Sequence, residues 1–326
     1  MSEVSVPAGP RFSVDPWDPS YGTGLDADDL SASDATVDAG VELPADRWRP
    51  LDPDPTVPAP TATLFVDGVR RVDAQVWVHG PGGASEPALC ASYAAGVVRC
   101  AGETAEPVAV EVERSLFTAA PDARDIATGA GPYRARPVSA RPDLAPAQAL
   151  SLALQHRLGE IEVTAAATAR AAAPETPDDL LVVDGPLRGR QHLPRVLGYV
   201  KTHRTRYLPP ALDPCVAALR PGQRTPVFLL GSSWQRHTWY LRLPTEPGSP
   251  WAGVVRLECS ATLTTGEAVA MARCSQVTLP RYASHGYKDS RAPQNLYPIA
   301  GLERVLRRRL GDAGVLYRML RRAAAA

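Results

Sequence analysis

The sequence predicts an α/β fold in which an antiparallel meander and one further, parallel strand form a mixed sheet flanked by helices. Strand-like patterns separated by short turns fill residues 61–117, which is typical of a meander. An alanine-rich stretch over 145–172 has helical periodicity, and a short continuous apolar run at 180–183 follows it. Strand, meander, helix and strand in this order bring the first and last strands together in parallel.

The predicted meander begins at Leu64–Asp67, and Arg71–His79 continues it with alternating apolar residues. The Asp67–Gly68 pair between these two runs predicts a hairpin turn. Two further strands are expected at Ala88–Cys100 and Val108–Phe117.

A single long helix is expected over residues 145–172. Its alanine content favours helix, and its apolar residues fall at helical spacing: Leu150, Leu154, Leu158 and Ile161. Pro174 and Pro177 then end it. The apolar run before Asp184 is short and continuous, as in a strand that is buried on both faces.

The remaining third of the chain predicts more strands, a helix and a basic C-terminal helical region. The strands are expected at Thr225–Leu230, Thr238–Leu243 and Gly253–Cys259, and the helix at Gly266–Cys274. The final region, Tyr297–Arg322, is expected to divide at Gly311–Asp312, with Asp312 as the N-cap of its second helix. Its arginines indicate either a solvated face or a contact with DNA or a partner.

Charge is distributed unevenly along the 326 residues, although the formal net charge is zero. Residues 1–60 contain 12 acidic residues and 3 arginines, whereas the rest contains 23 acidic and 32 basic residues. We expect residues 1–60 to be an acidic, proline-rich, largely disordered tail and 61–326 to be one folded domain. The basic body indicates a polyanionic partner, with the tail as a shield or simply as a solvated spacer.

The cysteines and the termini indicate a cytoplasmic protein. The five cysteines are odd in number and form no CxxC pair, which argues against a disulfide framework or a zinc site. The N-terminus lacks the basic and apolar regions of a secretory signal. No apolar run is long enough to span a bilayer, so no membrane association is expected.

Two aspartates, Asp67 and Asp184, each follow a buried apolar run and precede a glycine. Open α/β sheets place their ligand sites at the carboxyl ends of strands. Carboxylates are the hard oxygen ligands that Mg²⁺ and Mn²⁺ prefer. We therefore expect the two side chains to lie side by side and to hold a divalent metal. The alternative is that each Asp–Gly pair is only a turn.

A third carboxylate is expected from the long helix. Glu160 and Glu162 are two residues apart and cannot share a helix face, so one of them at most points at the site. Glu162 is favoured because it follows the buried leucines at helical spacing, and a solvated helix face is the alternative. Glu113 and Glu258 are weaker candidates.

A basic segment, KTHRTR, follows the Asp184 strand. Its basic residues alternate with period two: Lys201, His203, Arg204 and Arg206. This alternation predicts a groove that faces phosphates, with Tyr199 and Tyr207 available to stack on bases. Lys201 is also a candidate for contact with the scissile phosphate. An exposed basic strand or loop without a nucleic-acid partner is the alternative.

Several other function classes find no support in the motifs. The chain has no GxxxxGK[ST] phosphate loop and no GxGxxG after a strand. Ser232 and Ser233 lack the GxSxG surroundings of a hydrolase nucleophile.

Taken in order, these motifs resemble those of the NurA nucleases. The resemblance covers residues 61–310 and suggests a divergent, actinobacterial-type member. It lies in FVDG at Phe65–Gly68, the long helix with Glu162, LVVDGPL at Leu181–Leu187, VKTH and YL within Val200–Leu208, and Tyr297–Pro298 at the start of the final helix.

This resemblance implies an RNase H-like core and a Mn²⁺- or Mg²⁺-dependent nuclease that hydrolyses DNA in end processing and repair. It further implies a HerA-like hexameric ATPase as translocase partner, and a homodimer. By position, Asp67, Glu162 and Asp184 would be metal ligands, and Tyr297 would be the family's C-terminal tyrosine. The family's histidine in the following helix is missing; Glu303 and His285 are the candidates to replace it. Without a replacement, the chain would be a catalytically degenerate DNA-binding or translocase-docking protein.

Overall fold

The computed structural model describes residues 31–32, 35–80, 85–173, 178–203, 205–245 and 250–325. The chain divides into two compact units. We name them by their strands. The long-strand unit comprises Pro60–Asp184, His192–Val196 and Pro298–Ala326, and the short-strand unit comprises Met1–Ala59, Gly185–Gln191 and Leu197–Tyr297.

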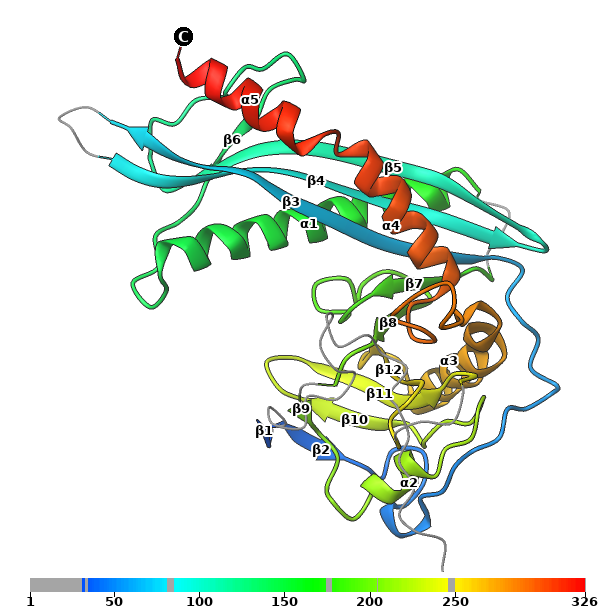
Figure 1. The fold of residues 1–326 in the computed structure, drawn as a ribbon. Coiled ribbons are helices and arrows are strands. Elements are labelled where there is room, and N and C mark those ends of the chain that lie inside the picture. The colour runs from blue at the N-terminus through cyan, green and yellow to red at the C-terminus, as the bar shows by residue number, and fades with distance from the viewer. Residues whose placement is uncertain are drawn as a thin grey trace, which may run out of the picture. The chain divides into compact units, whose positions relative to one another are not determined.

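The long-strand unit contains the predicted mixed sheet (Figure 1). Its strand order is β7, β3, β4, β5, β6, with the bounds Leu180–Asp184, Thr63–His79, Ser85–Ala101, Thr104–Thr118 and Arg134–Pro137. The three central strands are antiparallel, and β7 pairs in parallel with β3. The expected parallel pairing across the meander and the long helix is confirmed.

The predicted hairpin turn at Asp67–Gly68 is wrong, because both residues lie inside the single 17-residue strand β3. They pair with Gly96 and Ala95 of β4, and Gly68 does not have a positive φ angle. The glycine is instead required by a close approach. A Cβ atom at residue 68 would lie 2.5 Å from Oε1 of Glu162.

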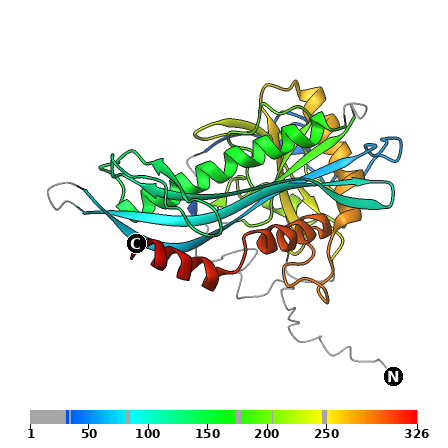
Figure 2. The ribbon, with the colours of Figure 1, turned by 90° about the horizontal axis from the view of Figure 1, so that it is seen from above.

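Helix α1, Pro146–Ala171, covers one face of the long strands and confirms the predicted helix (Figure 2). Its leucines pack against the odd-numbered residues of β4, as strand alternation requires. The core on this face comprises Leu89, Ala91, Tyr93, Ala95, Phe117, Leu150, Leu154, Leu158 and Ile161.

Helices α4, Tyr297–Arg309, and α5, Ala313–Ala324, belong to the opposite face (Figure 2). The predicted break between them is confirmed, because the Asp312 side chain caps α5 by accepting a hydrogen bond from the backbone N–H of Val315 at 2.8 Å. Leu302 and Leu306 of α4 pack over Gly96, where a Cβ atom would lie 3.1 Å from both side chains.

The short-strand unit contains an antiparallel sheet with helix α3, Thr265–Thr278, packed against it. The strand order is β2, β10, β11, β12, β8, with the bounds Thr36–Asp38, Phe228–Gly231, Gln235–Arg242, Val254–Ser260 and Val196–Val200. Thr264 and Glu267 form a capping box at the start of α3. The smaller elements are α2 at Asp213–Ala217 and the parallel pair β1 and β9 at Ser31–Ala32 and Thr205–Arg206.

Part of the acidic N-terminal segment belongs to this unit. Strand β2 pairs with β10, and Glu42 binds the buried Arg224 through two hydrogen bonds of 2.6 and 2.8 Å. Glu42 also accepts from the backbone N–H of Val227 at 2.7 Å. The predicted disordered tail otherwise concerns residues 1–30 and 33–34, which lie outside the described residues.

The cysteines agree with the expectation of reduced thiols, since all five are buried and none forms a disulfide. Burial raises the pKa of Cys90 to about 12, which keeps its thiol protonated and unreactive. In the described part of the chain, every helix is too short or too polar to span a bilayer.

The contact at Gly68 yields a stability prediction. We expect Gly68→Ala to lower the free energy of unfolding by about 1–3 kcal/mol, because the new methyl group would meet both Glu162 and Leu158 in a packed layer. Urea denaturation measures the change. The matched control is Gly266→Ala in α3, where no atom lies within 4 Å of the added carbon and no loss is expected.

Candidate metal centre

The register of two parallel strands brings Asp67 and Asp184 together. Val66 of β3 is the partner of Val183 of β7, so the aspartates occupy the next position on each strand. Residues at matching positions of neighbouring strands point to the same face of a sheet. Because Gly96 faces α4 and is the partner of Asp67 on β4, that face is the one covered by α4.

Helix α4 supplies a third carboxylate. Leu302 and Leu306 fix the helix over Gly96, and Glu303 lies between them in the sequence. Asp67, Asp184 and Glu303 each offer one carboxylate oxygen, and these three atoms lie within 4.8 Å of one another. Asp67 is buried, and the other two are half-buried. We call these residues the acidic trio.

The donor set of the acidic trio suits a hard divalent cation. Three carboxylate oxygens with no sulfur or imidazole among them are the ligands preferred by Mg²⁺ and Mn²⁺ rather than by zinc or copper. Oδ1 of Asp67 accepts a hydrogen bond from the backbone N–H of Gly68 at 2.7 Å, which orients its carboxylate. Gly185, directly after Asp184, has a φ of 101°, so the chain turns sharply once the carboxylate is in place.

Two arginines hold the carboxyl end of α4. Nη1 of Arg71 donates to the backbone oxygen of Gly311 at 2.7 Å, and Nη2 of Arg114 donates to that of Leu310 at 3.2 Å. These carbonyls belong to the end of a helix, where they lack intrahelical partners. The two contacts therefore fix the helix that carries Glu303.

A buried aspartate in the β3 bulge anchors this arrangement. The register of β3 against β4 shifts between Val72 and Ala74, which places Asp73 in the bulge. Its carboxylate accepts from Nε of Arg71 at 2.8 Å and from the hydroxyl of Tyr133 at 3.0 Å. Asp73 and its partner Arg71 were not predicted from the sequence, because a bulge leaves no signal in a run of alternating residues; Arg114, on β5, was not predicted either.

Glu162 is buried, as favoured over Glu160, but it lies on the other face of the sheet. Its Oε1 atom packs against Gly68, which points toward α1, whereas the neighbouring Asp67 points toward α4. Glu160 is exposed and binds Arg157 at 2.6 Å. The structure thus brings Asp67, Asp184 and Glu303 together and places Glu162 beneath the strand that carries Asp67.

In the short-strand unit, Tyr297 and Lys201 have defined partners. The hydroxyl of Tyr297 is 2.8 Å from Nδ1 of His285, and their rings stack with centroids 5.9 Å apart. Nζ of Lys201 donates to Oδ1 of Asn295 at 2.9 Å. Of the two candidate replacements for the missing histidine, Glu303 is the one that joins the acidic trio.

The predicted phosphate-facing groove is corrected at two positions. His203 is 5% exposed, packs against the rings of both Tyr240 and Trp251, and has Nε2 3.0 Å from the backbone oxygen of Val254. Tyr199 is fully buried, and its hydroxyl donates to the backbone oxygen of Gln294. Both side chains fill the interior and cannot meet a nucleic acid.

The remaining basic residues of that segment are not equivalent. Arg206 is exposed, and its Nε lies 3.5 Å from the carboxylate of Asp213. Arg204 lies outside the described residues. Tyr207 is half-buried under the guanidinium of Arg256, which lies 4.7 Å from the ring centroid.

The two weaker carboxylate candidates serve as partners of arginines. Burial by itself would raise the pKa of Glu113, but hydrogen bonds from Arg157 and Tyr93 hold that pKa below its usual value. Glu258 is fully buried; it accepts from the backbone N–H of Leu187 at 2.5 Å and pairs with Arg236 at 3.0 Å.

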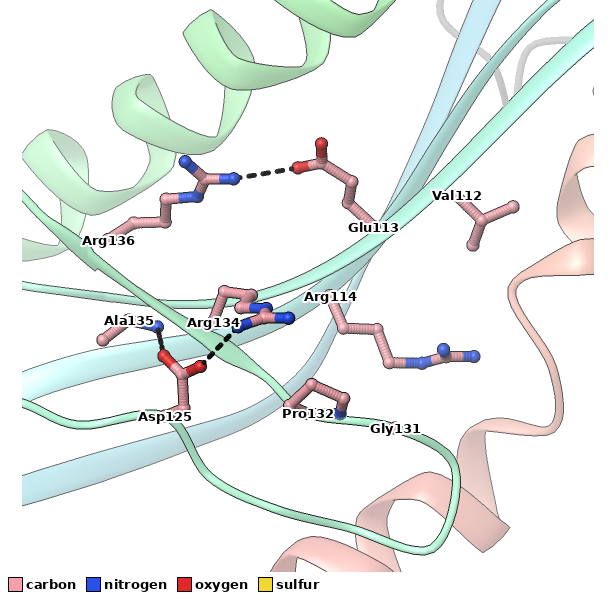
Figure 3. Close-up of a pocket in the computed structure, with 9 residues that line it drawn as sticks. All are labelled: Val112, Glu113, Arg114, Asp125, Gly131, Pro132, Arg134, Ala135 and Arg136. Atoms are coloured by element: carbon pink, nitrogen blue, oxygen red, sulfur yellow. Dashed lines mark hydrogen bonds and ion pairs between the residues drawn. The ribbon is translucent and has the colours of Figure 1, made fainter.

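A cavity of about 480 Å³ lies in the long-strand unit near the start of β6 (Figure 3). Figure 3 shows that its two carboxylates are both bound by arginines, Glu113 by Arg136 and Asp125 by Arg134. No member of the acidic trio lines it. The acidic trio, and not this cavity, is therefore the candidate metal site.

No protein-family model and no curated protein matches the chain. Among solved structures, the chain is similar to the NurA nuclease from Sulfolobus solfataricus, with 11% identity and a TM-score of 0.42. The alignment covers 81% of this chain and 84% of that one. At 11% identity, the function has to be inferred from this chain's own residues.

The acidic trio predicts a metal-dependent gain in stability. We expect Mn²⁺ at about 100 times its dissociation constant to stabilise the protein by about 2.7 kcal/mol, since the ion binds only the folded arrangement. Glu303→Gln should remove most of this gain, whereas Glu160→Gln, on the exposed surface of α1, should keep it. Thermal denaturation with and without Mn²⁺ measures the effect, and equal shifts in both variants would exclude the site.

Burial of His203 predicts a dependence of stability on pH. Burial lowers the pKa of His203 from 6.5 to about 4, so the unfolded chain binds a proton at a pH where the folded chain does not. Its contribution is complete above pH 6.5 and is lost as the pH falls toward 4, by about 3 kcal/mol. We expect His203→Phe to lose less stability between pH 7 and pH 4 than wild type. The His156→Gln variant, which removes an exposed histidine, is the control for the loss of an imidazole.

Proposed function

We propose that this protein is a nuclease that hydrolyses phosphodiester bonds in DNA with a divalent cation held by Asp67, Asp184 and Glu303. The observation that carries the proposal is the meeting of three carboxylates within 4.8 Å, two from adjacent parallel strands and one from a helix. The order of the FVDG, LVVDGPL and Tyr–Pro motifs, which resembles that of the NurA nucleases, supports the same reading.

The cation has one function in this proposal. When bound, it supplies Lewis-acid activation of the attacking water and stabilisation of the leaving oxygen, which an anionic phosphodiester requires. Both Mn²⁺ and Mg²⁺ accept an all-carboxylate donor set. Mn²⁺ is our first choice because the resemblance to the NurA nucleases implies it, and Mg²⁺ is the second.

The chain's own residues position the cation and the substrate. Asp67 is oriented by the N–H of Gly68, and Glu303 by a helix whose end is held by Arg71 and Arg114. Lys201, steadied by Asn295, is the candidate contact for the scissile phosphate. Arg206 is proposed as a further contact with the DNA backbone. Arg204 is proposed as another such contact on the basis of the sequence alone.

Tyr297 is proposed as the catalytic tyrosine. Its hydroxyl and Nδ1 of His285 are 2.8 Å apart, so a proton can pass between these two atoms. Glu162, proposed from the sequence as a ligand, has a supporting function in this account, because its carboxylate packs under Gly68 beside Asp67.

The finer parts of the proposal come from the family resemblance. They are an RNase H-like core, action in DNA end processing and repair, a HerA-like hexameric ATPase as translocase partner, a homodimer and a cytoplasmic location. The second candidate function is a degenerate DNA-binding or translocase-docking protein, which the missing family histidine favours. The two differ in one respect, because only the nuclease turns over DNA when Mn²⁺ is added.

Cleavage of a labelled DNA duplex and of a single strand tests the proposal. Purified protein should cut in the presence of Mn²⁺ and not in EDTA. Asp184→Asn and Asp67→Asn should each lower the rate by about 100-fold or more, since each removes a charge at the reacting centre.

The outcomes separate the two candidate functions. Glu160→Gln should retain the wild-type rate, which controls for the loss of an acidic residue elsewhere. DNA binding without any Mn²⁺-dependent cleavage would support the degenerate module. Unchanged cleavage in Asp184→Asn would refute the site.

A further inference from the structure

A loop of the short-strand unit presents aromatic and basic side chains to solvent. Tyr287 is 79% exposed, which is the highest value among the exposed large hydrophobic side chains of the described residues. His285 and Lys288 beside it are also exposed. Together with the half-buried Tyr297, we call these residues the aromatic–basic platform.

The rings and the cation of the platform are arranged around one another. The ring of His285 lies 5.7 Å from that of Tyr287 and 5.9 Å from that of Tyr297, centroid to centroid. Nζ of Lys288 lies 5.4 Å from the centroids of both tyrosine rings. An ammonium group placed so close to aromatic rings is held by cation–π attraction.

Hydrogen bonds within the loop hold this arrangement in place. The backbone N–H groups of Lys288 and Asp289 both donate to the backbone oxygen of His285, at 2.9 and 3.1 Å. Nδ2 of Asn295, which is fully buried, donates to Asp289 at 2.7 Å. The backbone of this loop is therefore anchored to the interior through Asp289 and Asn295.

The charge of the platform suits an anion. The single acidic residue of this turn, Asp289, directs its carboxylate to Asn295 and to the backbone N–H of Arg291 at 2.8 Å. The exposed run from His285 to Lys288 contains no acidic residue. An exposed aromatic face next to a lysine matches a nucleotide, which has a flat base and a negative phosphate.

We propose that the aromatic–basic platform is a binding subsite for a single-stranded DNA segment. One unpaired base stacks on the ring of Tyr287, and Lys288 contacts the adjoining phosphate. A base within a duplex has both of its faces stacked on its neighbours, so the segment that we propose for this subsite is single-stranded. This subsite deepens the proposed nuclease function, since it names the form of DNA that is held.

Binding of a fluorescein-labelled ten-residue oligothymidylate, in EDTA so that no cleavage occurs, tests the subsite. Tyr287→Ala should weaken binding by about 5- to 150-fold, the range for loss of one base–aromatic stack. Tyr287→Phe keeps the ring and should bind as wild type does. Tyr317→Ala, which removes a tyrosine that is 47% exposed on α5, is the matched control and should also bind as wild type does.

An abasic oligomer of the same length separates stacking from charge. Tyr287→Ala should leave its binding unchanged, whereas Lys288→Ala should weaken the binding of both oligomers. Equal affinity of wild type and Tyr287→Ala for oligothymidylate, or no measurable affinity in wild type, would overturn the subsite.

Failure of the subsite is distinguishable from failure of the nuclease proposal. A Tyr287→Ala variant that binds normally, with Mn²⁺-dependent cleavage intact, rejects the subsite alone. Platform binding without any cleavage rejects the nuclease alone. If Tyr287→Ala weakened the binding of an oligouridylate more than that of oligothymidylate, this would contradict DNA as the strand that the subsite binds.

Discussion

The in-register parallel pairing of β3 with β7 is the constraint on which the candidate site depends. It joins two segments whose aspartates are 117 positions apart in the chain, and it aligns them so that both carboxylates point to one face. A shift of one residue would turn Asp67 toward α1 and away from Asp184. Long-range strand pairing, supported by the buried apolar residues at 64–66 and 180–183, therefore determines whether a metal site exists.

The two helical layers have different functions around this pairing. Side chains of helix α1 lie so close to Gly68 that a Cβ atom there would be 2.5 Å from Oε1 of Glu162 and 2.8 Å from Cδ1 of Leu158, and this contact positions the strand from one side. Helix α4 packs over Gly96 on the other side and delivers Glu303. Gly68, next to Asp67 on β3, thus allows the close contact with α1. Gly96, the partner of Asp67 on β4, allows the close contact with α4, and the Asp67 side chain faces α4.

Three carboxylates within 4.8 Å are electrostatically unfavourable unless positive charge lies near them. At an effective dielectric constant of about 20, two charges at such a distance repel by a few kcal/mol. A fold retains such a cluster most readily when a cation offsets the repulsion in the working state.

Much of the fold could be predicted from the sequence, and the failures have physical reasons. The helix over 145–172, the parallel pairing and the Asp312 cap followed from periodicity and capping chemistry, which are local signals. The Asp67–Gly68 turn was wrong because glycine was required by a neighbouring helix that is distant in sequence.

The site was less predictable for the same reason. Glu162, expected as a metal ligand, is buried, but it lies on the α1 side of the sheet; that side follows from the alternation of β3, which the predicted turn concealed. Glu303 was a candidate ligand only because the histidine of the family is missing from this chain. His203 was read as a phosphate contact because period two cannot tell an exposed strand from a buried side chain.

The most direct measurement is anomalous scattering from a crystal soaked in Mn²⁺. We predict a peak in contact with carboxylate oxygens of Asp67, Asp184 and Glu303. A map without a peak there, or coordinates in which these three side chains point away from one another, would contradict the account.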